Sequence, residues 1–308
     1  MRVLFVFLDG VGLGEGDASR NVFVARPPPV LTSLIGDAAP LATASPIVAE
    51  RATLRALDAC FGASGLPQSG TGQAALLTGR DAVATFGRHF GPWVPAVLQP
   101  LVRNESVLSR AKAAGLDVAF ANAYPEEILV DTPQGGRSRR ASRFLTAGPP
   151  LAAAGAGVLV RHTAALTNGD ALASEITNDA WRTRLGRTGL PDIDAREAGR
   201  NLTRIAAAHD LTLFAHYGTD YAGHKRSMDA AIAAIVIIDR FLSGILESLP
   251  GDMVLVVSSD HGNIEDVRTG HTRNPAIGLV VGPGHEEFCH GWRSLLDVTP
   301  GILRGLGV

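Results

Sequence analysis

The stretch VLFVFLDGVGLGEG, residues 3–16, opens the chain with a continuous apolar run that ends in an aspartate and a series of glycines. A run in which every side chain is apolar is typical of a strand buried on both faces of a parallel sheet. Similar short apolar runs recur at 116–120, 157–160, 211–217, 253–259 and 276–281. We therefore expect residues 3–8 to form one strand of a mostly parallel sheet.

Segments with helical periodicity separate these runs, at 106–115, 194–209, 228–249 and 294–307. Alternating strands and helices predict an α/β fold, a three-layer sandwich around a mostly parallel sheet. In such sheets ligands bind in the crevice beyond the carboxyl ends of the strands. A reactive side chain that directly follows a strand is therefore a stronger functional candidate than one elsewhere.

The glycines after the first strand also suggest a dinucleotide-binding loop, which needs the pattern G-x-G-x-x-G. Counted from Gly10, the sixth position is Glu15, and counted from Gly12 it is Asp17. Neither register fits the pattern. The first loop is therefore not predicted to bind a dinucleotide.

The composition argues against several classes of function. A net charge of -2 gives no electrostatic attraction for nucleic acid or for an anionic membrane surface. No apolar run reaches the roughly 18–20 residues that a membrane span needs. Two cysteines, Cys60 and Cys289, are too few for a disulfide framework. We expect a cytoplasmic protein that binds neither nucleic acid nor membrane, and its oligomeric state stays open.

Metal-binding side chains lie next to the predicted strands at four places. Each alone is more often part of a turn, a solvated loop or a helix cap. Because carboxyl ends of parallel strands meet at one edge of a sheet, we expect these side chains to converge and to fill two metal sites. Mixed carboxylate and imidazole ligands suit Zn²⁺ or Mn²⁺ better than Ca²⁺. The six residues are Asp9, Asp220, His224, Asp260, His261 and His271.

A candidate nucleophile lies in LPQSGTGQAALLTGR, residues 66–80. Ser69 and Thr71 occupy a glycine-rich turn ahead of a short apolar helix predicted from Ala74 to Leu77. A hydroxyl at a helix N-terminus meets free backbone N–H groups and the positive end of the helix dipole, which suits a bound phosphate. The same residue types also suit an ordinary N-cap. A neighbouring base or metal would be needed to activate the serine.

Together these motifs resemble those of the alkaline phosphatase superfamily, most closely the branch that contains cofactor-independent phosphoglycerate mutase and phosphopentomutase. The resemblance covers roughly residues 1–125 and 195–308, with the motifs in family order. The matching stretches are LDGVGLGEGD, NVFVARPPPVLTSL, QSGTGQAALLTGR, TDYAGH, SSDHGN, GHTRNP and SLLDVTPGILRGLG.

The resemblance implies a role for each side chain. Ser69 would be the nucleophile because it stands three residues before Gly72, where the family has Ser or Thr, and Thr71 is the alternative. Its attack on a substrate phosphate would form a phosphoserine. The cofactors would be two divalent ions, Mn²⁺ or Zn²⁺. One ion would be held by Asp220, His224 and His271, and the other by Asp9, Asp260, His261 and the Ser69 hydroxyl.

The segment 126–194 follows a different pattern, because glycine, proline and arginine are dense and the alternation of strands and helices weakens. We expect it to be an inserted cap or substrate region. Residues 1–125 and 195–308 would then form the metal-binding catalytic core.

The chain departs from the mutases at two points. Gln73 stands where they carry a histidine after the glycine of the nucleophile loop, and only about 70 residues remain for a cap. A mutase must exclude water while the phosphoryl group is returned, which a small cap makes harder. We therefore expect a two-metal phosphoester hydrolase, a phosphomonoesterase acting on a small-molecule phosphoester. A phosphodiesterase or nucleotide pyrophosphatase, or a phosphomutase, are alternatives on the same scaffold.

Residues that bind the rest of the substrate have fainter signals. Arg88 and His89 follow the nucleophile helix and are our candidates. Arginine forks suit phosphate or carboxylate groups. The arginines of RSRRASR, residues 137–143, fit a solvated face better and stay outside the predicted site.

Overall fold

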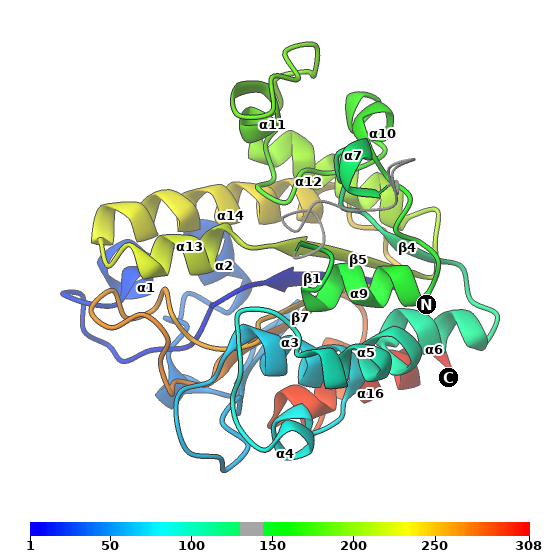
Figure 1. Cartoon of the computed structure of the whole chain (residues 1–308). Helices are drawn as coiled ribbons and strands as arrows, with labels where there is room; N and C mark the ends of the chain where they lie inside the picture. Colours follow the sequence, from blue (N-terminus) through cyan, green and yellow to red (C-terminus); the bar gives the residue numbers. More distant parts are fainter. Residues whose placement is uncertain (130–143) are drawn as a thin grey trace.

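The computed structural model describes residues 1–129 and 144–308 and shows an α/β fold of three layers (Figure 1). Within these residues, seven strands form one mixed sheet in the order β2-β3-β7-β6-β1-β5-β4. β4, β5, β1 and β6 are parallel neighbours, whereas β7, β3 and β2 join by antiparallel pairs. The predicted α/β sandwich with a parallel centre is confirmed. The strands are β1 (Arg2–Leu8), β2 (Ile47–Val48), β3 (Ala52–Leu57), β4 (Val118–Phe120), β5 (Leu211–His216), β6 (Met253–Ser258) and β7 (Ala276–Val281).

β1 lies in the middle of the sheet and pairs in parallel with both β5 and β6. Its even-numbered residues pack into the core under one helical layer, and its odd-numbered residues pack into the core under the other. Burial on both faces explains why residues 3–8 contain no polar side chain. Because β1 ends at Leu8, Asp9 lies at the carboxyl edge of the sheet.

Helices cover both faces of the sheet (Figure 1). One layer contains α1 (Val22–Ala25), α2 (Pro29–Leu34), α12 (Ala195–Ala206) and α14 (Met228–Ser248). The other contains α3 (Ser69–Thr78), α5 (Gln99–Glu105), α6 (Val107–Ala113), α9 (Gly148–Gly155) and α16 (Val298–Leu306). The shorter helices are α4 (Ala82–Phe86), α7 (Glu126–Leu129), α10 (Thr163–Thr167), α11 (Asp179–Thr183), α13 (Gly218–His224) and α15 (His285–Phe288), with 3₁₀ turns at Ala42–Ala44, Ala96–Leu98 and Leu295–Asp297.

Two parts of the sheet differ from the prediction. The run 157–160 is not a strand, because its backbone closes the end of α9, where the N–H of Val158 donates to the carbonyl of Ala153 at 2.8 Å. β2 and β3 lie outside the predicted strands, since the sequence ATLRAL of β3 has no continuous apolar run. β3 joins the sheet through an antiparallel pairing with β7, so the sheet is more mixed than expected.

The segment 126–194 has two parts among its described residues. α9 packs beside α5, and its Leu151 and Ala152 belong to the core of that helical layer. α7, α10 and α11 instead project beyond the layer of α12 and α14 (Figure 1). The part of this segment that stands clear of the sandwich is therefore smaller than its length suggests, and its role as a cap stays a prediction.

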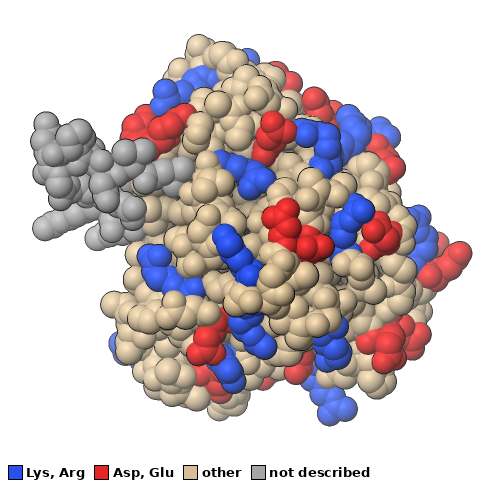
Figure 2. All heavy atoms as spheres, turned by 90° about the vertical axis from the view of Figure 1, so that its right-hand side faces the viewer, with Lys and Arg blue, Asp and Glu red and all other residues tan. Residues whose placement is uncertain are grey.

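The described surface mixes both signs of charge. On the face drawn in Figure 2, Lys and Arg side chains lie interspersed with Asp and Glu. Among residues 1–129 and 144–308, no helix has both the length and the apolar character that crossing a bilayer requires.

α12 and α14 cross with their backbones in close contact. A Cβ atom on Gly244 would lie 1.9 Å from the carbonyl oxygen of Arg196, and one on Gly199 would lie 2.3 Å from the carbonyl oxygen of Phe241. Neither distance leaves room for a methyl group, so the crossing needs glycine on both helices.

We expect Gly244→Ala to lower the free energy of unfolding by about 1–3 kcal/mol, because the added methyl group must push the two helices apart. Gly251→Ala is the matched control, since no atom of the described residues, apart from Gly251 and its two chain neighbours, lies within 4 Å of its Cβ position. Denaturant-induced unfolding measures both variants. Equal stability of the two would contradict the close crossing.

Candidate metal centre and nucleophile

Two groups of metal-binding side chains converge at the carboxyl edge of the sheet. The ligand-type atoms within each group lie within 4.8 Å of one another. The convergence follows from the parallel pairing of β1 with β5 and β6, which brings the ends of these three strands side by side. The first group is Asp9, Asp260 and His261, and the second is Asp220, His224 and His271.

The first group is buried. Asp9 is 5% exposed, and Asp260 and His261 are 0% exposed. His261 Nε2 lies 3.4 Å from Asp9 Oδ1 and 3.6 Å from Asp260 Oδ2. Within the described residues, these two carboxylate oxygens have no hydrogen-bond partner. Buried carboxylates with unpaired oxygens are costly unless a cation compensates them, so this group fits a metal ion.

Ser69 joins this group from α3, with its Oγ 3.0 Å from His261 Nε2. The helix begins at Ser69 itself, and Gln68 at the N-cap makes no side-chain capping bond. The prediction of a turn that continues to Ala74 is therefore wrong, because the glycines at 70 and 72 are already helical. The positive end of the helix dipole lies at Ser69, where it favours an anionic group.

Thr71, the alternative nucleophile, has a different environment. Its Oγ1 accepts a hydrogen bond from the N–H of Phe90 at 3.1 Å and lies 3.4 Å from the carbonyl oxygens of Gln68 and Phe90. The hydroxyl thus anchors the loop at Phe90 to α3. This arrangement supports Ser69 over Thr71.

The second group is more exposed. His271 Nδ1 donates to the carbonyl of Pro67 at 2.8 Å, since a carbonyl can only accept. In the neutral ring, Nε2 therefore carries no proton, and it lies 3.2 Å from His224 Nε2. Asp220 Oδ2 lies 3.3 Å from His224 Nε2, and its Oδ1 lies 3.5 Å from His271 Nε2. Two imidazole nitrogens and a carboxylate gathered in this way also fit a cation.

The two groups adjoin each other. The rings of His261 and His271 stack with their centroids 4.0 Å apart. A Cβ atom on Gly10 would lie 2.6 Å from Asp220 Oδ1, and Gly10 has a φ of +68°, which favours glycine. Because Gly10 has no side chain, the loop after β1 can pass close to Asp220 of the second group.

The charges of the cluster perturb one another strongly. Burial and the Asp260 carboxylate raise the pKa of Asp9 well above its usual range. Burial would lower the pKa of His261, but the carboxylates of Asp260 and Asp9 outweigh it and raise that pKa to about 10. Burial would raise the pKa of Asp220, but His271 and His261 hold it at about 2. A divalent cation here would favour charged carboxylates and neutral imidazoles.

Gln73, noted in the sequence only as a departure from the mutases, contacts the centre. Its Nε2 donates to Asp9 Oδ2 at 2.9 Å, and its Oε1 accepts from the N–H of Gly148 at 2.8 Å. The side chain is buried. Gln73 thereby fixes the Asp9 carboxylate and ties it to the first residue of α9.

Glu265 is a further residue that the motifs do not reveal. Its buried carboxylate accepts hydrogen bonds from three loops. Oε2 accepts from the N–H groups of Gly12 at 3.0 Å and Asn263 at 2.8 Å, and Oε1 accepts from the hydroxyl of Thr272 and from Asn274 Nδ2 at 3.0 Å. These loops carry Asp9, Asp260 with His261, and His271. The only available signal was an acidic residue two positions after SSDHGN.

The centre opens into a cavity of about 680 Å³, lined by Asp9, Ser69 and Asp220 among others. Arg88 and His89 are not part of its lining as the described residues define it. The Arg88 guanidinium instead lies 5.9 Å from the ring centroid of Phe86, and His89 is half-buried, with its pKa lowered by burial. The arginines of residues 137–143 lie outside the described residues.

We expect Asp9→Asn to lose bound metal while keeping the fold, because the amide removes the charge of a buried ligand that the cation compensates. Asp252→Asn, which removes an exposed charge at the start of β6, is the control. Elemental analysis gives the metal stoichiometry, and circular dichroism checks the fold. If Asp9→Asn keeps the metal stoichiometry of the unmodified protein, Asp9 is only part of the turn after β1 and not a metal ligand.

Glu265→Gln is expected to weaken metal binding by about 10–100-fold, because its amide nitrogen cannot accept and leaves donors of the ligand-bearing loops unpaired. Asp239→Asn is the matched control: its buried carboxylate accepts from the N–H groups of Val30 and Leu31, in the layer of α2 and α14. Metal titration of the chelator-treated proteins measures affinity, and thermal unfolding measures stability. An equal loss of metal affinity in both variants would contradict a specific role for Glu265.

Comparisons with known proteins agree with these features. The profile of the Metalloenzyme superfamily matches residues 1–308. A 2,3-bisphosphoglycerate-independent phosphoglycerate mutase from Legionella pneumophila (strain Lens) is 29% identical over 129 residues, which are 38% of this chain and 25% of that protein. The match thus spans about a quarter of the length of that relative.

Solved structures share the fold over nearly the whole chain. The PH0037 protein from Pyrococcus horikoshii has a TM-score of 0.58 at 13% identity, covering 99% of this chain and 96% of that one. A cold-active alkaline phosphatase from the psychrophile Shewanella sp. has a TM-score of 0.53 at 13% identity, covering 99% of this chain and 100% of that one. At these identities the likeness establishes the fold. Because the family profile spans the entire sequence, the chain belongs to the Metalloenzyme superfamily.

Proposed function

We propose that the protein is a two-metal phosphoester hydrolase that cleaves phosphomonoesters through a phosphoserine at Ser69. The main support is the position of Ser69 Oγ, 3.0 Å from His261 Nε2. His261 in turn lies next to the oxygens of Asp9 and Asp260 that have no hydrogen-bond partner among residues 1–129 and 144–308. A serine hydroxyl at a helix N-terminus among metal-type ligands is suited to attack a phosphate.

Two sets of residues would bind the metal ions, and further residues would hold these ligands in position. Bound there, Mn²⁺ or Zn²⁺ would lower the pKa of the serine hydroxyl and neutralise phosphoryl charge. Gln73 would hold Asp9 in place, and the carbonyl of Pro67 would orient His271. The N-terminus of α3 would favour the negative charge of the phosphate. One ion would be held by Asp220, His224 and His271, and the other by Asp9, Asp260, His261 and Ser69 Oγ.

The proposed reaction has two steps. Ser69 Oγ forms a bond to phosphorus as the bond to the leaving-group oxygen breaks, and the proton lost by the Ser69 hydroxyl is balanced by the proton that the departing alkoxide takes up to become the alcohol. Water then attacks the phosphoserine, which frees inorganic phosphate and returns the Ser69 hydroxyl. A mutase would differ only in the second step, where a hydroxyl of the substrate would replace water.

The size of the segment 126–194 supports hydrolysis over transfer. A mutase must enclose its intermediate and exclude water. Part of this segment, α9, packs into the core beside α5, which leaves less chain to enclose a substrate. We therefore propose a catalytic core of residues 1–125 and 195–308 with a small cap from 126–194. The name of the matched Legionella relative keeps the mutase as the second candidate.

Ser69→Ala is expected to lower kcat with p-nitrophenyl phosphate by about 10³-fold or more, because the variant lacks the hydroxyl that attacks phosphorus. Thr71→Val, which removes the alternative hydroxyl, should retain most of the activity. Acid-quenched wild-type protein should carry phosphate on the peptide that contains Ser69. Unchanged turnover in Ser69→Ala across a panel of phosphomonoesters would refute the proposal.

Two further substrates separate the rival functions. Faster cleavage of bis(p-nitrophenyl) phosphate than of the monoester would indicate a phosphodiesterase. Conversion of 3-phosphoglycerate to 2-phosphoglycerate without free phosphate would indicate a mutase. Release of inorganic phosphate from monoesters alone is the outcome we expect.

A further inference from the structure

The cavity beside Ser69 has a wall that the proposed reaction does not use, formed by the segment 174–184. Glu175 lies in this wall. Its Oε2 lies 3.3 Å from the hydroxyl of Ser174, and its Oε1 is buried with no hydrogen-bond partner among the described residues. The chain thus places a carboxylate in the wall of the cavity that Ser69 also lines.

Backbone pairing fixes this wall to the sheet. The N–H of Leu172 donates to the carbonyl of Ala121, and the N–H of Ala123 donates to the carbonyl of Leu172, both at 2.8 Å. Residues 121–123 directly follow β4. The segment that leads into Glu175 is therefore an extension of the sheet edge.

A histidine provides a second attachment, next to the metal centre. His216, the last residue of β5, donates from Nδ1 to the carbonyl of Ser174 at 2.8 Å. Burial lowers the pKa of His216 to about 4, so the ring is neutral and keeps this donor. The carbonyl of His216 accepts the N–H of Asp9 at 2.9 Å. One strand end thus holds both Asp9 and the turn that carries Glu175.

The turn also has a strained backbone. Ile176 has a φ of +76°, a region that β-branched residues rarely occupy. Its side chain is fully buried in the core beneath α12 and α14. Glu175 and Thr177, on either side, line the cavity. The strained residue therefore anchors the turn so that its neighbours face the cavity.

The charged groups of this wall are acidic in balance. The ionisable side chains that line the cavity from this segment are Glu175, Asp179 and Arg184. A carboxylate accepts hydrogen bonds from hydroxyl and amine groups and repels a second anion. A ligand hydroxyl or amine that reaches the Glu175 carboxylate from the cavity would form a charge-assisted hydrogen bond with it.

We propose that Glu175 binds a hydroxyl or amine on the leaving group, so that the protein prefers phosphomonoesters of neutral or cationic alcohols to those that carry a second anion. This preference would affect catalysis only if the proposed function is correct. The matched pair that tests it is glycerol 3-phosphate and 3-phosphoglycerate. They share a three-carbon skeleton and differ in having a hydroxymethyl group or a carboxylate at one end.

The test measures binding in the absence of turnover. Calorimetric titration of Mn²⁺-loaded Ser69→Ala protein at alkaline pH should show glycerol 3-phosphate binding at least about 10-fold more tightly than 3-phosphoglycerate. Adding Glu175→Gln should reduce this ratio to about 2-fold or less, since the amide has no charge to repel the carboxylate. Glu175→Ala serves the same purpose if the glutamine variant unfolds.

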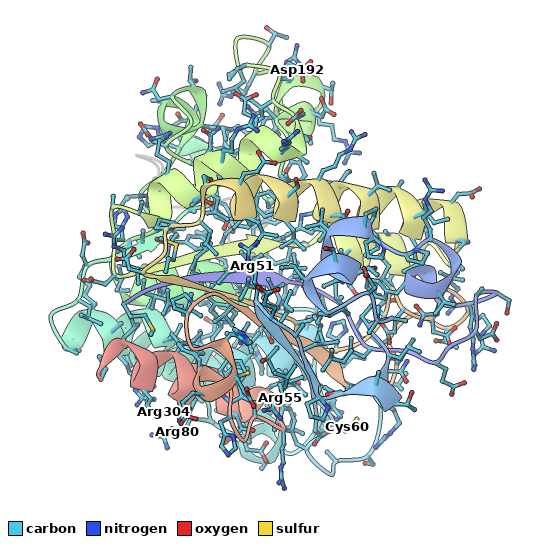
Figure 3. The ribbon with its side chains drawn as sticks, turned by 180° about the vertical axis from the view of Figure 1, so that it is seen from behind. Arg51, Arg55, Cys60, Arg80, Asp192 and Arg304 are labelled. Atoms are coloured by element: carbon cyan, nitrogen blue, oxygen red, sulfur yellow. The ribbon has the colours of Figure 1, made fainter. Side chains whose placement is uncertain are left out.

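Asp192→Asn is the matched control. It removes one carboxylate from the segment 126–194, but Asp192 is 77% exposed, pairs with Arg182 and lies at the outer tip of the molecule (Figure 3). When Asp192→Asn is added to Ser69→Ala, the ratio of the affinities for glycerol 3-phosphate and 3-phosphoglycerate should equal the ratio in the Ser69→Ala parent alone. Equal affinity for the two compounds in the parent, an unchanged ratio in Glu175→Gln, or failure of both compounds to bind would overturn the proposal. Absence of phosphoester turnover in the unmodified protein would instead refute the proposed function and leave this binding ratio as measured.

Discussion

Two carboxylates buried side by side, Asp9 and Asp260, are the constraint on which the rest of this molecule depends. Each follows a central parallel strand, and each has an oxygen without a hydrogen-bond partner among the described residues. In a medium of low polarity such a pair repels itself and loses its hydration. A cation bound to this group would offset the cost. Folding of the sheet edge would then be coupled to metal binding.

The hydrogen bonds around the ligands show how the fold prepares for this coupling. Glu265 connects the distant loop at Gly12 to the nearby loop at 272–274, and Gln73 connects α3 to Asp9 and to the start of α9. The backbone carbonyl of Pro67 sets the orientation of His271. These supports come from separate elements, so the geometry of the centre depends on the packing of the sandwich as a whole.

Much of this arrangement could be predicted because a simple rule covers it: side chains that follow parallel strands meet at one edge. The rule places Asp9, Asp260 and His261 correctly. It does not reach Gln73 or Glu265, because their contacts join residues 64 and 253 positions apart. Nor does the rule predict the position of Glu175. That position depends on a turn in which Ile176 has a positive φ, and an isoleucine in the sequence does not indicate such a turn.

Local patterns misled where the tertiary structure decides the outcome. The glycines around Ser69 look like a turn, yet they are helical. Close packing explains why glycine is needed there, because a Cβ atom on Gly72 would lie 2.6 Å from the carbonyl oxygen of Asp260. The amide of Gln73, one residue further along this helix, has a different consequence. A histidine in that place can gain or lose a proton near neutral pH, whereas an amide cannot. The Gln73 amide that donates to Asp9 therefore keeps its proton in both mildly acidic and mildly alkaline surroundings.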